Sequence, residues 1–187
     1  MNTIDKMEKV FGHLKKPSPR ELKEALEKLE VSEEELLPFI KDPGNKPYGK
    51  KSLYRTEHVE IVVANWVPFN KCSPHDHGGS FGWIYVVSGE TAHTLYKIED
   101  GVPVPHVEKQ EKTSTVFFTS QTMIHDMGNQ KDQPLVTLHS YSPPVTGMRV
   151  YDLNRCASCI VSKDCGAWWP EEQKKRLREI KFKRSVH

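Results

Sequence analysis

The first forty residues carry apolar side chains at a helical spacing. The series begins at Ile4 and continues through Met7, Val10 and Phe11 to Leu14. Side chains three and four positions apart share one face of a helix. The spacing therefore predicts a first amphipathic helix at the N-terminal end of the chain.

Two further helix starts carry a serine followed three residues later by a glutamate. Ser18 precedes Glu21, with Pro19 at the first helical position, and Ser32 precedes Glu35. In this capping-box pattern each side chain accepts a backbone hydrogen bond that the first turn cannot satisfy internally. We therefore expect three short helices before residue 41.

Beyond the turn cluster at residues 42–45, the pattern becomes that of β-strands. Several segments are short, rich in β-branched or aromatic residues, and separated by Gly, Pro, Asn or Asp. These segments are residues 59–64, 83–87, 91–96, 114–118 and 135–141. Regular short strands predict an antiparallel sandwich or barrel, of which the jelly roll is one form.

The C-terminal segment predicts a closing basic helix at residues 170–183. It opens with Pro170, and Leu177 and Ile180 are three positions apart. Such a helix would pack its apolar face on the barrel or contact another subunit. We expect one domain over residues 1–187, made of a helical extension (1–41), a barrel (46–152), and a cysteine-rich segment with the basic helix (153–187).

Composition limits the possible partners. The 27 basic and 25 acidic residues give a net charge of +2, too weak a bias to indicate nucleic acid as a partner. No apolar run approaches the roughly 20 residues of a membrane-spanning helix, and the N-terminus lacks the apolar core of a secretory signal. We expect a soluble cytoplasmic protein, a monomer or weak homodimer, that binds neither membrane nor nucleic acid.

Three of the four cysteines, Cys156, Cys159 and Cys165, lie within ten residues. A disulfide-stapled exported domain would spread its cysteines more widely, so reduced thiols are expected. Three interpretations stay open for this cluster: packing against Trp168 and Trp169, a zinc site that needs a fourth ligand, or a redox-active dithiol.

The histidines carry the strongest chemical signal. His75 and His77 are two positions apart, which on a strand directs both imidazoles to one face. His125 is the best third ligand because it follows a predicted strand and precedes an apparent Gly128-Asn129 turn. A same-face pair with a third histidine favours a metal site over structural histidines. Of the other histidines, His58, His93 and His106 are expected to be surface or packing residues, and His13 and His187 show no evident partner.

This arrangement resembles the two motifs of the cupin barrel, also called the double-stranded β-helix. The usual first motif adds a glutamate after the His-x-His pair, but residues 78–83 contain no carboxylate. Three neutral imidazoles would leave a divalent ion its full charge and open positions for a bidentate substrate and dioxygen. A thiolate would gain most from that charge.

The segments 73–77 and 138–144 together resemble the cysteine dioxygenase family in its bacterial form. The resemblance covers roughly residues 46–152 and includes Trp66. It implies that the three histidines bind Fe(II), with O2 as co-substrate, and that Thr137, His139 and Tyr141 line the pocket. A hydroxyl held by an imidazole can donate a hydrogen bond to oxygen or substrate.

Two positions depart from the family pattern. The cysteine that animal members cross-link to the tyrosine is Gly82 here, so no cross-link is expected. The family's carboxylate-binding Tyr-x-Arg segment is Tyr48-Gly49-Lys50, and lysine offers a point charge instead of a bidentate fork. Arg55 is a second candidate for that contact.

The expected activity is therefore oxidation of the thiol of L-cysteine to the sulfinate. Two alternatives remain: a dioxygenase of another small thiol such as 3-mercaptopropionate, or a metal-binding cupin that acts as an isomerase or sensor. Imidazole suits Fe, Zn, Ni and Cu alike, so the metal is open at this point.

Overall fold

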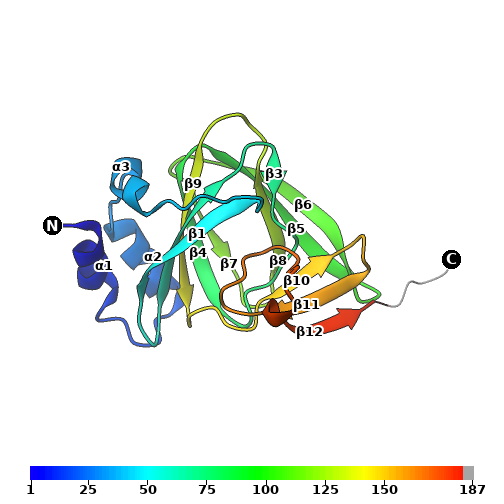
Figure 1. The fold of residues 1–187 in the computed structure, drawn as a ribbon. Coiled ribbons are helices and arrows are strands. Elements are labelled where there is room, and N and C mark those ends of the chain that lie inside the picture. The colour runs from blue at the N-terminus through cyan, green and yellow to red at the C-terminus, as the bar shows by residue number, and fades with distance from the viewer. Residues whose placement is uncertain (183–187) are drawn as a thin grey trace.

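The computed structural model describes residues 1–182 and is mainly β, with helices at one end (Figure 1). The helices are α1 (Thr3–Phe11), α2 (Pro19–Lys28), α3 (Glu33–Leu36) and the 3-10 turns η1 (Leu37–Phe39) and η2 (Gln173–Lys175). The expected three helices before residue 41 are confirmed. Ser18 and Ser32 cap α2 and α3 in complete capping boxes with Glu21 and Glu35.

Twelve strands form three antiparallel sheets in the described residues. The five-stranded sheet has the order β1 (Tyr48–Arg55), β2 (Glu60–Trp66), β9 (Leu135–Ser142), β4 (Phe81–Ser88) and β7 (Val116–Thr119). The four-stranded sheet has the order β3 (Asn70–Lys71), β8 (Ile124–Asn129), β5 (Glu90–Glu99) and β6 (Val102–Lys112). The third sheet is β10 (Arg149–Asp152), β11 (Ala157–Val161) and β12 (Arg176–Lys181).

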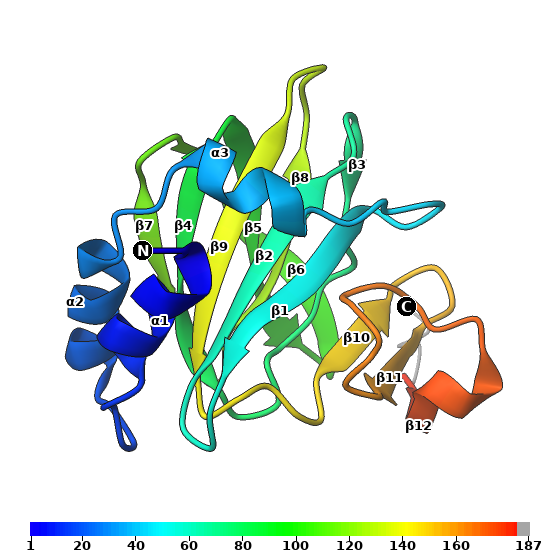
Figure 2. The same ribbon diagram turned by 60° about the vertical axis from the view of Figure 1, so that its left-hand side comes forward.

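The five-stranded sheet is covered on both faces. Helices α1 to α3 lie against its outer face, as Figure 2 shows. Every residue of the central strand β9 is buried. Because side chains alternate along a strand, one set packs under the helices and the other faces the barrel interior. Val136 and Leu138 join the helical core, whereas Leu135 joins the interior core with Trp66 and Met127.

The prediction of a C-terminal helix is wrong. Within residues 170–182 the chain forms the short turn η2 and then β12, which pairs with β11 through Ala157↔Lys181 and Ser158↔Ile180. Two apolar residues give a helix little to bury, and Leu177 stays 62% exposed. The unpaired backbone groups of β11 are instead satisfied by a neighbouring strand. Residues 183–187, including His187, lie outside the described part of the chain.

The prediction of a turn at Gly128-Asn129 is also wrong, because both residues belong to strand β8. A Cβ on Gly128 would lie 2.5 Å from the Cβ of Lys71 and 2.7 Å from the carbonyl oxygen of Asn70. Glycine is therefore required by the close approach of β3 and not by a turn.

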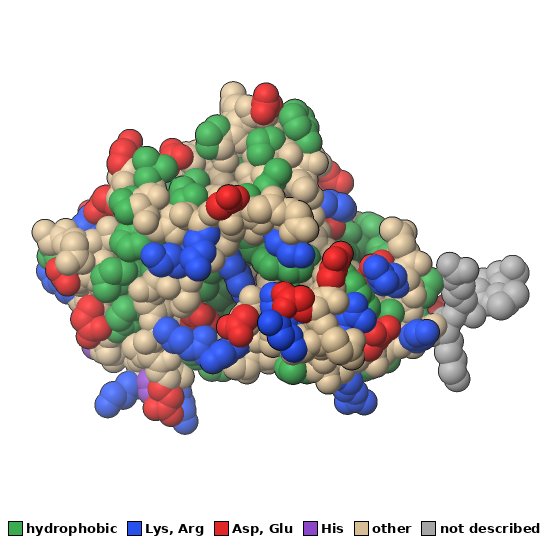
Figure 3. Space-filling model, in the orientation of Figure 1, with side chains coloured by type: hydrophobic (Ala, Val, Ile, Leu, Met, Phe, Trp, Pro, Cys, Tyr) green, Lys and Arg blue, Asp and Glu red, His purple; other side chains and the backbone are tan. Residues whose placement is uncertain are grey.

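Acidic and basic side chains lie interspersed over the face shown in Figure 3, which agrees with the small net charge. Among residues 1–182, no helix is long and apolar enough to cross a membrane.

Candidate metal centre and substrate cavity

Three buried histidines meet in the barrel interior. Ring nitrogens of His75, His77 and His125 all lie within 4.8 Å of one another, and each residue is at most 6% exposed. Within residues 1–182, this is the only cluster of three or more His, Cys, Asp or Glu side chains with the spacing of a metal site. The structure thus brings together the three histidines that the sequence selects.

The ligands come from two segments that pair through single bridges. His75 and His77 lie between β3 and β4, outside the named strands, and His125 lies in β8. The backbone N–H of each of His75 and His125 donates to the carbonyl of the other, at 2.9 and 3.0 Å. This local pairing, instead of the expected regular strand, places the two motifs side by side.

The state of the three rings suits a divalent metal ion. Burial, the largest cause, lowers the pKa of His75 and lowers that of His77 and His125 well below the usual range. The rings are therefore neutral at neutral pH and carry lone pairs. Nδ1 of His75 lies 2.9 Å from the carbonyl oxygen of Ser73, which can only accept, so its proton is on Nδ1 and Nε2 is available as a ligand.

The two facing nitrogens of the cluster give a further reason to expect an ion. Nε2 of His77 and Nε2 of His125 are 3.3 Å apart. Two lone pairs at this separation repel unless a proton or a cation lies between them. The donor set of three imidazoles therefore fits a first-row transition metal.

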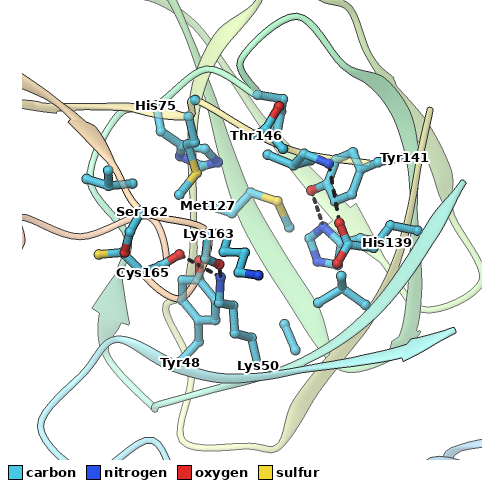
Figure 4. Close-up of a pocket in the computed structure, with 18 of the residues that line it drawn as sticks. Tyr48, Lys50, His75, Met127, His139, Tyr141, Thr146, Ser162, Lys163 and Cys165 are labelled. Carbon is cyan, nitrogen blue, oxygen red and sulfur yellow. Dashed lines mark hydrogen bonds between the residues drawn. The ribbon is translucent and has the colours of Figure 1, made fainter. Parts of the chain in front are cut away.

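A chain of hydrogen bonds runs along the interior face of β9. The indole Nε1 of Trp66 donates to Oγ1 of Thr137 at 2.9 Å. Oγ1 of Thr137 lies 2.8 Å from Nε2 of His139, and Nδ1 of His139 lies 2.9 Å from the hydroxyl of Tyr141 (Figure 4). Residues 137, 139 and 141 are two apart, so the period of the strand alone directs them to one side.

The direction of this chain follows from its first member. An indole can only donate, so Thr137 accepts from Trp66. Within residues 1–182, the Thr137 hydroxyl then donates its own hydrogen to Nε2 of His139. The remaining proton of His139 is then on Nδ1 and donates to Tyr141, because burial lowers the pKa of His139 to about 3 and keeps the ring neutral. The Tyr141 hydroxyl accepts this bond, so its own hydrogen points away from His139.

Tyr141 stands beside the metal ligands and lines the cavity. Its ring centroid is 5.0 Å from that of His77, and burial raises its pKa well above the usual range. The phenol therefore stays protonated and can donate a hydrogen bond into the cavity.

Gly82 lies directly against Tyr141. A Cβ at position 82 would lie 2.5 Å from Cδ1 of Tyr141 and 2.4 Å from the carbonyl oxygen of Ser140. This is the position where the family resemblance implies a cross-linking cysteine in animal members. Glycine leaves the tyrosine free of a covalent bond to residue 82.

The triad and Tyr141 open onto a cavity of about 100 Å³. Pockets for drug-sized ligands measure roughly 300–1,000 Å³, so this cavity suits a much smaller molecule. Figure 4 shows Tyr141 and His139 on one side and Lys50, Tyr48 and Cys165 on the other. Ser162 and Lys163, which follow β11, complete a wall that the sequence does not predict.

Lys50 reaches this cavity as the sequence predicts. Its ammonium donates to the carbonyl oxygen of Cys165 at 2.6 Å and to that of Lys163 at 3.4 Å. No ion pair to Lys50 occurs within residues 1–182. Burial lowers its pKa. An ammonium has three N–H donors, so one remains for a ligand.

The two other predicted substrate contacts are engaged elsewhere. Arg55 lines the cavity but forms an ion pair with Glu60 at 2.9 Å. Tyr48 also lines it, and its hydroxyl accepts from the backbone N–H of Ala167 at 2.8 Å while its ring packs on Trp66.

The cysteines of the C-terminal segment do not assemble a metal site in the described part of the chain. Cys159 and Cys165 are buried in a small core with Trp168 and Trp169 beside them, which supports the packing interpretation. Cys156 lies in the turn before β11, at a φ of 50°.

Sequence comparison identifies the family to which these features belong. The model of cysteine dioxygenase type I matches residues 48–154, which is more than half of the chain and includes His75, His77, His125 and all of β9. The chain belongs to the cysteine dioxygenase type I family. The family match ends before Ser162, so the cavity wall after β11 lies outside it.

A solved oxalate oxidase shows the same architecture at low sequence identity, and other solved structures are similar over part of the chain. An oxalate oxidase, determined with the substrate analogue glycolate, is 13% identical, with a TM-score of 0.51 over 60% of this chain and 59% of its own. A Klebsiella pneumoniae protein with a double-stranded β-helix domain is 17% identical, with a TM-score of 0.49 over 59% of this chain and 89% of its own. At such identities the likeness to oxalate oxidase concerns the fold alone, and the expected cupin fold is confirmed.

The sequence places His93 among the surface or packing residues and does not reveal its contact with the metal centre. His93 is buried, and its Nε2 lies 2.8 Å from Nδ1 of the ligand His125. The strand predicted at residues 91–96 contains His93, but the sequence does not show which strand pairs with it.

Proposed function

We propose that this protein is an Fe(II)-dependent thiol dioxygenase that oxidises L-cysteine to cysteine sulfinic acid. The observation that carries the proposal is the polarised chain from Trp66 to Tyr141 beside three neutral imidazoles. A sensor has no catalytic step for a phenol donor to assist, and a proton-moving isomerase would need a base as well, whereas this phenol stays protonated. The reaction consumes one thiolate and one O2, and both oxygen atoms end on sulfur, so no external reductant is needed.

The triad His75, His77 and His125 would hold the iron. When bound there, a ferrous ion supplies a Lewis-acidic, redox-active centre with positions for a thiolate and for dioxygen. The absence of a carboxylate in the triad leaves that positive charge for the anionic sulfur.

Tyr141 would orient substrate and oxygen. Its hydroxyl receives a hydrogen bond from His139 and directs its own proton into the cavity. Because Trp66 can only donate, the chain cannot reverse while Thr137 keeps its hydroxyl. Tyr141 is therefore a fixed donor at the reacting sulfur and oxygen atoms, which are the atoms that gain negative charge.

Lys50 would bind the substrate carboxylate. The two carbonyls of residues 163 and 165 hold its ammonium in place, and the third N–H is left for an anion. This contact is a single point charge, so it selects for a negative group without fixing the group's plane.

The main alternative, a dioxygenase for another small thiol, is favoured by the same lysine. A single ammonium does not fix the orientation of the carboxylate, so the site tolerates substrates that differ in the distance between carboxylate and sulfur. On this ground 3-mercaptopropionate is an alternative substrate to cysteine. Cysteamine, which has no carboxylate, lacks the group that Lys50 would bind.

The deciding experiment is oxygen uptake by anaerobically Fe(II)-loaded protein with L-cysteine, 3-mercaptopropionate and cysteamine. We expect one O2 consumed per sulfinate formed, with cysteine preferred and cysteamine poor. Tyr141→Phe should lower kcat about 100-fold. Its matched control is Tyr54→Phe, which loses a hydroxyl bonded to Glu8 away from the cavity.

Lys50→Met tests the carboxylate contact. It should raise KM for cysteine about 10- to 100-fold, on the order of 1.4–2.8 kcal/mol. Lys51→Met is the control, because the next residue of β1 faces the opposite side and its ammonium lies over Phe39. High activity on cysteamine alone would refute the cysteine assignment, and a metal-loaded protein that oxidises no thiol would favour an isomerase or sensor.

We also propose that the protein works in the cytoplasm, where thiols stay reduced. The buried, unlinked thiols of Cys72, Cys159 and Cys165 support this location.

A further inference from the structure

The ligand His125 contacts a second buried imidazole that the proposed chemistry does not use. His93, in β5, is 3% exposed, and its Nε2 lies 2.8 Å from Nδ1 of His125. The two rings are nearly perpendicular, at 82°, while the ring of His93 packs against Phe117 with centroids 4.6 Å apart. Packing therefore holds His93 in the orientation that meets His125.

An imidazole is not the usual partner of a metal-binding histidine. Such ligands normally donate their second N–H to a carboxylate, a backbone carbonyl or water. The adjacent carboxylate of Asp126 is engaged elsewhere, since the Tyr96 hydroxyl and the Lys71 ammonium both donate to its Oδ2. Nδ1 of His125 is thus paired with a neutral ring.

The position of one proton in this pair decides whether His125 can bind a metal. With the proton on Nδ1 of His125, that group donates to His93, and Nε2 of His125 presents a lone pair to an ion. With the proton on Nε2 of His93, His125 carries its own proton on Nε2. That proton then points at Nε2 of His77, 3.3 Å away, and occupies the place of the metal.

The arrangement that admits a metal leaves one buried donor unpaired. His93 then carries its proton on Nδ1, an atom that is buried and has no hydrogen-bond partner within residues 1–182. An unpaired buried donor opposes folding. The fold alone gives no reason for this arrangement, whereas a metal ion on Nε2 of His125 does, because it fixes the proton of that ring on Nδ1.

Resting on the metal site of the proposed function, we propose that His93 is a positioning residue that holds His125 as a neutral metal ligand. It accepts the Nδ1 proton and so directs Nε2 of His125 at the ion. A carboxylate in its place would attract that proton more strongly and make the ligand more electron-rich. The imidazole keeps all three ligands neutral, and the ion keeps the charge that attracts a thiolate.

The test compares metal binding by three variants at this position. His93→Phe keeps a ring beside Phe117 but has no acceptor, and we expect Fe(II) affinity to fall about 10- to 100-fold. His93→Gln offers a side-chain oxygen and should recover most of the affinity. His93→Glu should bind Fe(II) more tightly than the wild type and lower the Fe(III)/Fe(II) midpoint potential. His106→Phe, at an exposed position of β6, is the matched control.

Affinity is measured anaerobically by competition with a chromophoric chelator, and the absorption spectrum of the Co(II)-loaded protein reports the ligand field independently of activity. Circular dichroism and thermal unfolding verify that each variant folds. If His93→Phe fails to fold, the Gln and Glu variants carry the comparison of affinity and potential.

The inference is overturned if His93→Phe binds Fe(II) as tightly as the wild type with an unchanged Co(II) spectrum. It is also overturned if His93→Gln loses as much affinity as His93→Phe, since the hydrogen bond would then not be the cause. A wild-type protein that binds Fe(II) but oxidises no thiol refutes the dioxygenase and leaves the effect of His93 on affinity standing.

Discussion

Replacing Thr137 by valine tests the direction of the hydrogen-bond chain that ends at Tyr141. Thr137 is completely buried, and valine has nearly the same shape, so the change opens no cavity. It removes the acceptor of the Trp66 indole, at 2.9 Å, and the donor to Nε2 of His139, at 2.8 Å. The substitution thus isolates the loss of one hydroxyl.

The expected loss of stability follows from the two groups that are left unpaired. Each buried polar group without a partner costs about 1–3 kcal/mol, and the two losses share one hydroxyl, so we expect about 2–5 kcal/mol in total. Urea unfolding under anaerobic conditions measures this value. Thr137→Ser, which keeps the hydroxyl, should lose less than about 1.5 kcal/mol, because only a methyl group is removed.

The expected loss of activity has a different cause. Without the Thr137 hydroxyl, His139 is free to carry its proton on Nε2 and to accept at Nδ1 from Tyr141. The phenol proton would then turn away from the cavity, and kcat for thiol oxidation should fall about 10- to 100-fold, a typical share of acid–base assistance.

Oxygen uptake at saturating thiol measures this kcat. Thr137→Ser should retain most of it. A folded Thr137→Val protein that keeps the wild-type kcat would refute the argument about direction, even if its stability falls as expected.

Three further predictions concern the neighbouring residues. Gly82→Ala should destabilise the fold by about 1–3 kcal/mol in urea and lower kcat, because the added Cβ would collide with the Ser140 carbonyl and the Tyr141 ring; wild-type values for both would contradict the close approach. Burial lowers the pKa of Lys50, and the charged form binds the carboxylate, so KM for cysteine should rise more steeply with pH in the wild type than in Lys50→Arg over a range below the usual lysine value; the substrate thiol ionises in both proteins alike, so identical profiles would remove Lys50 from substrate binding. Fe(II) at 100 times its Kd should stabilise the wild type by about 2.7 kcal/mol in anaerobic thermal unfolding; His125→Ala should show no such gain, and an equal gain would place the metal elsewhere.

The sequence alone was sufficient for the features that depend on local spacing. The serine–glutamate pairs predict the starts of α2 and α3, since a capping box is complete within four residues. Alternation along residues 135–141 places Thr137, His139 and Tyr141 on one face, whatever that face meets. The His75 and His77 pair and the distant His125 are recognisable as a motif, and the comparison confirms the family.

Only the tertiary structure decided what these faces meet. The pairing of β5 with β8 brings His93 to His125, and the loop after β11 brings two carbonyls to Lys50. Both contacts join residues far apart in sequence, so no local pattern reports them. The C-terminal segment forms a strand because β11 offers unpaired backbone groups, and that partner is invisible to the spacing of Leu177 and Ile180. Spacing determines which side chains share a face, whereas the packing of the sheets determines which faces meet and therefore what chemistry the shared cavity supports.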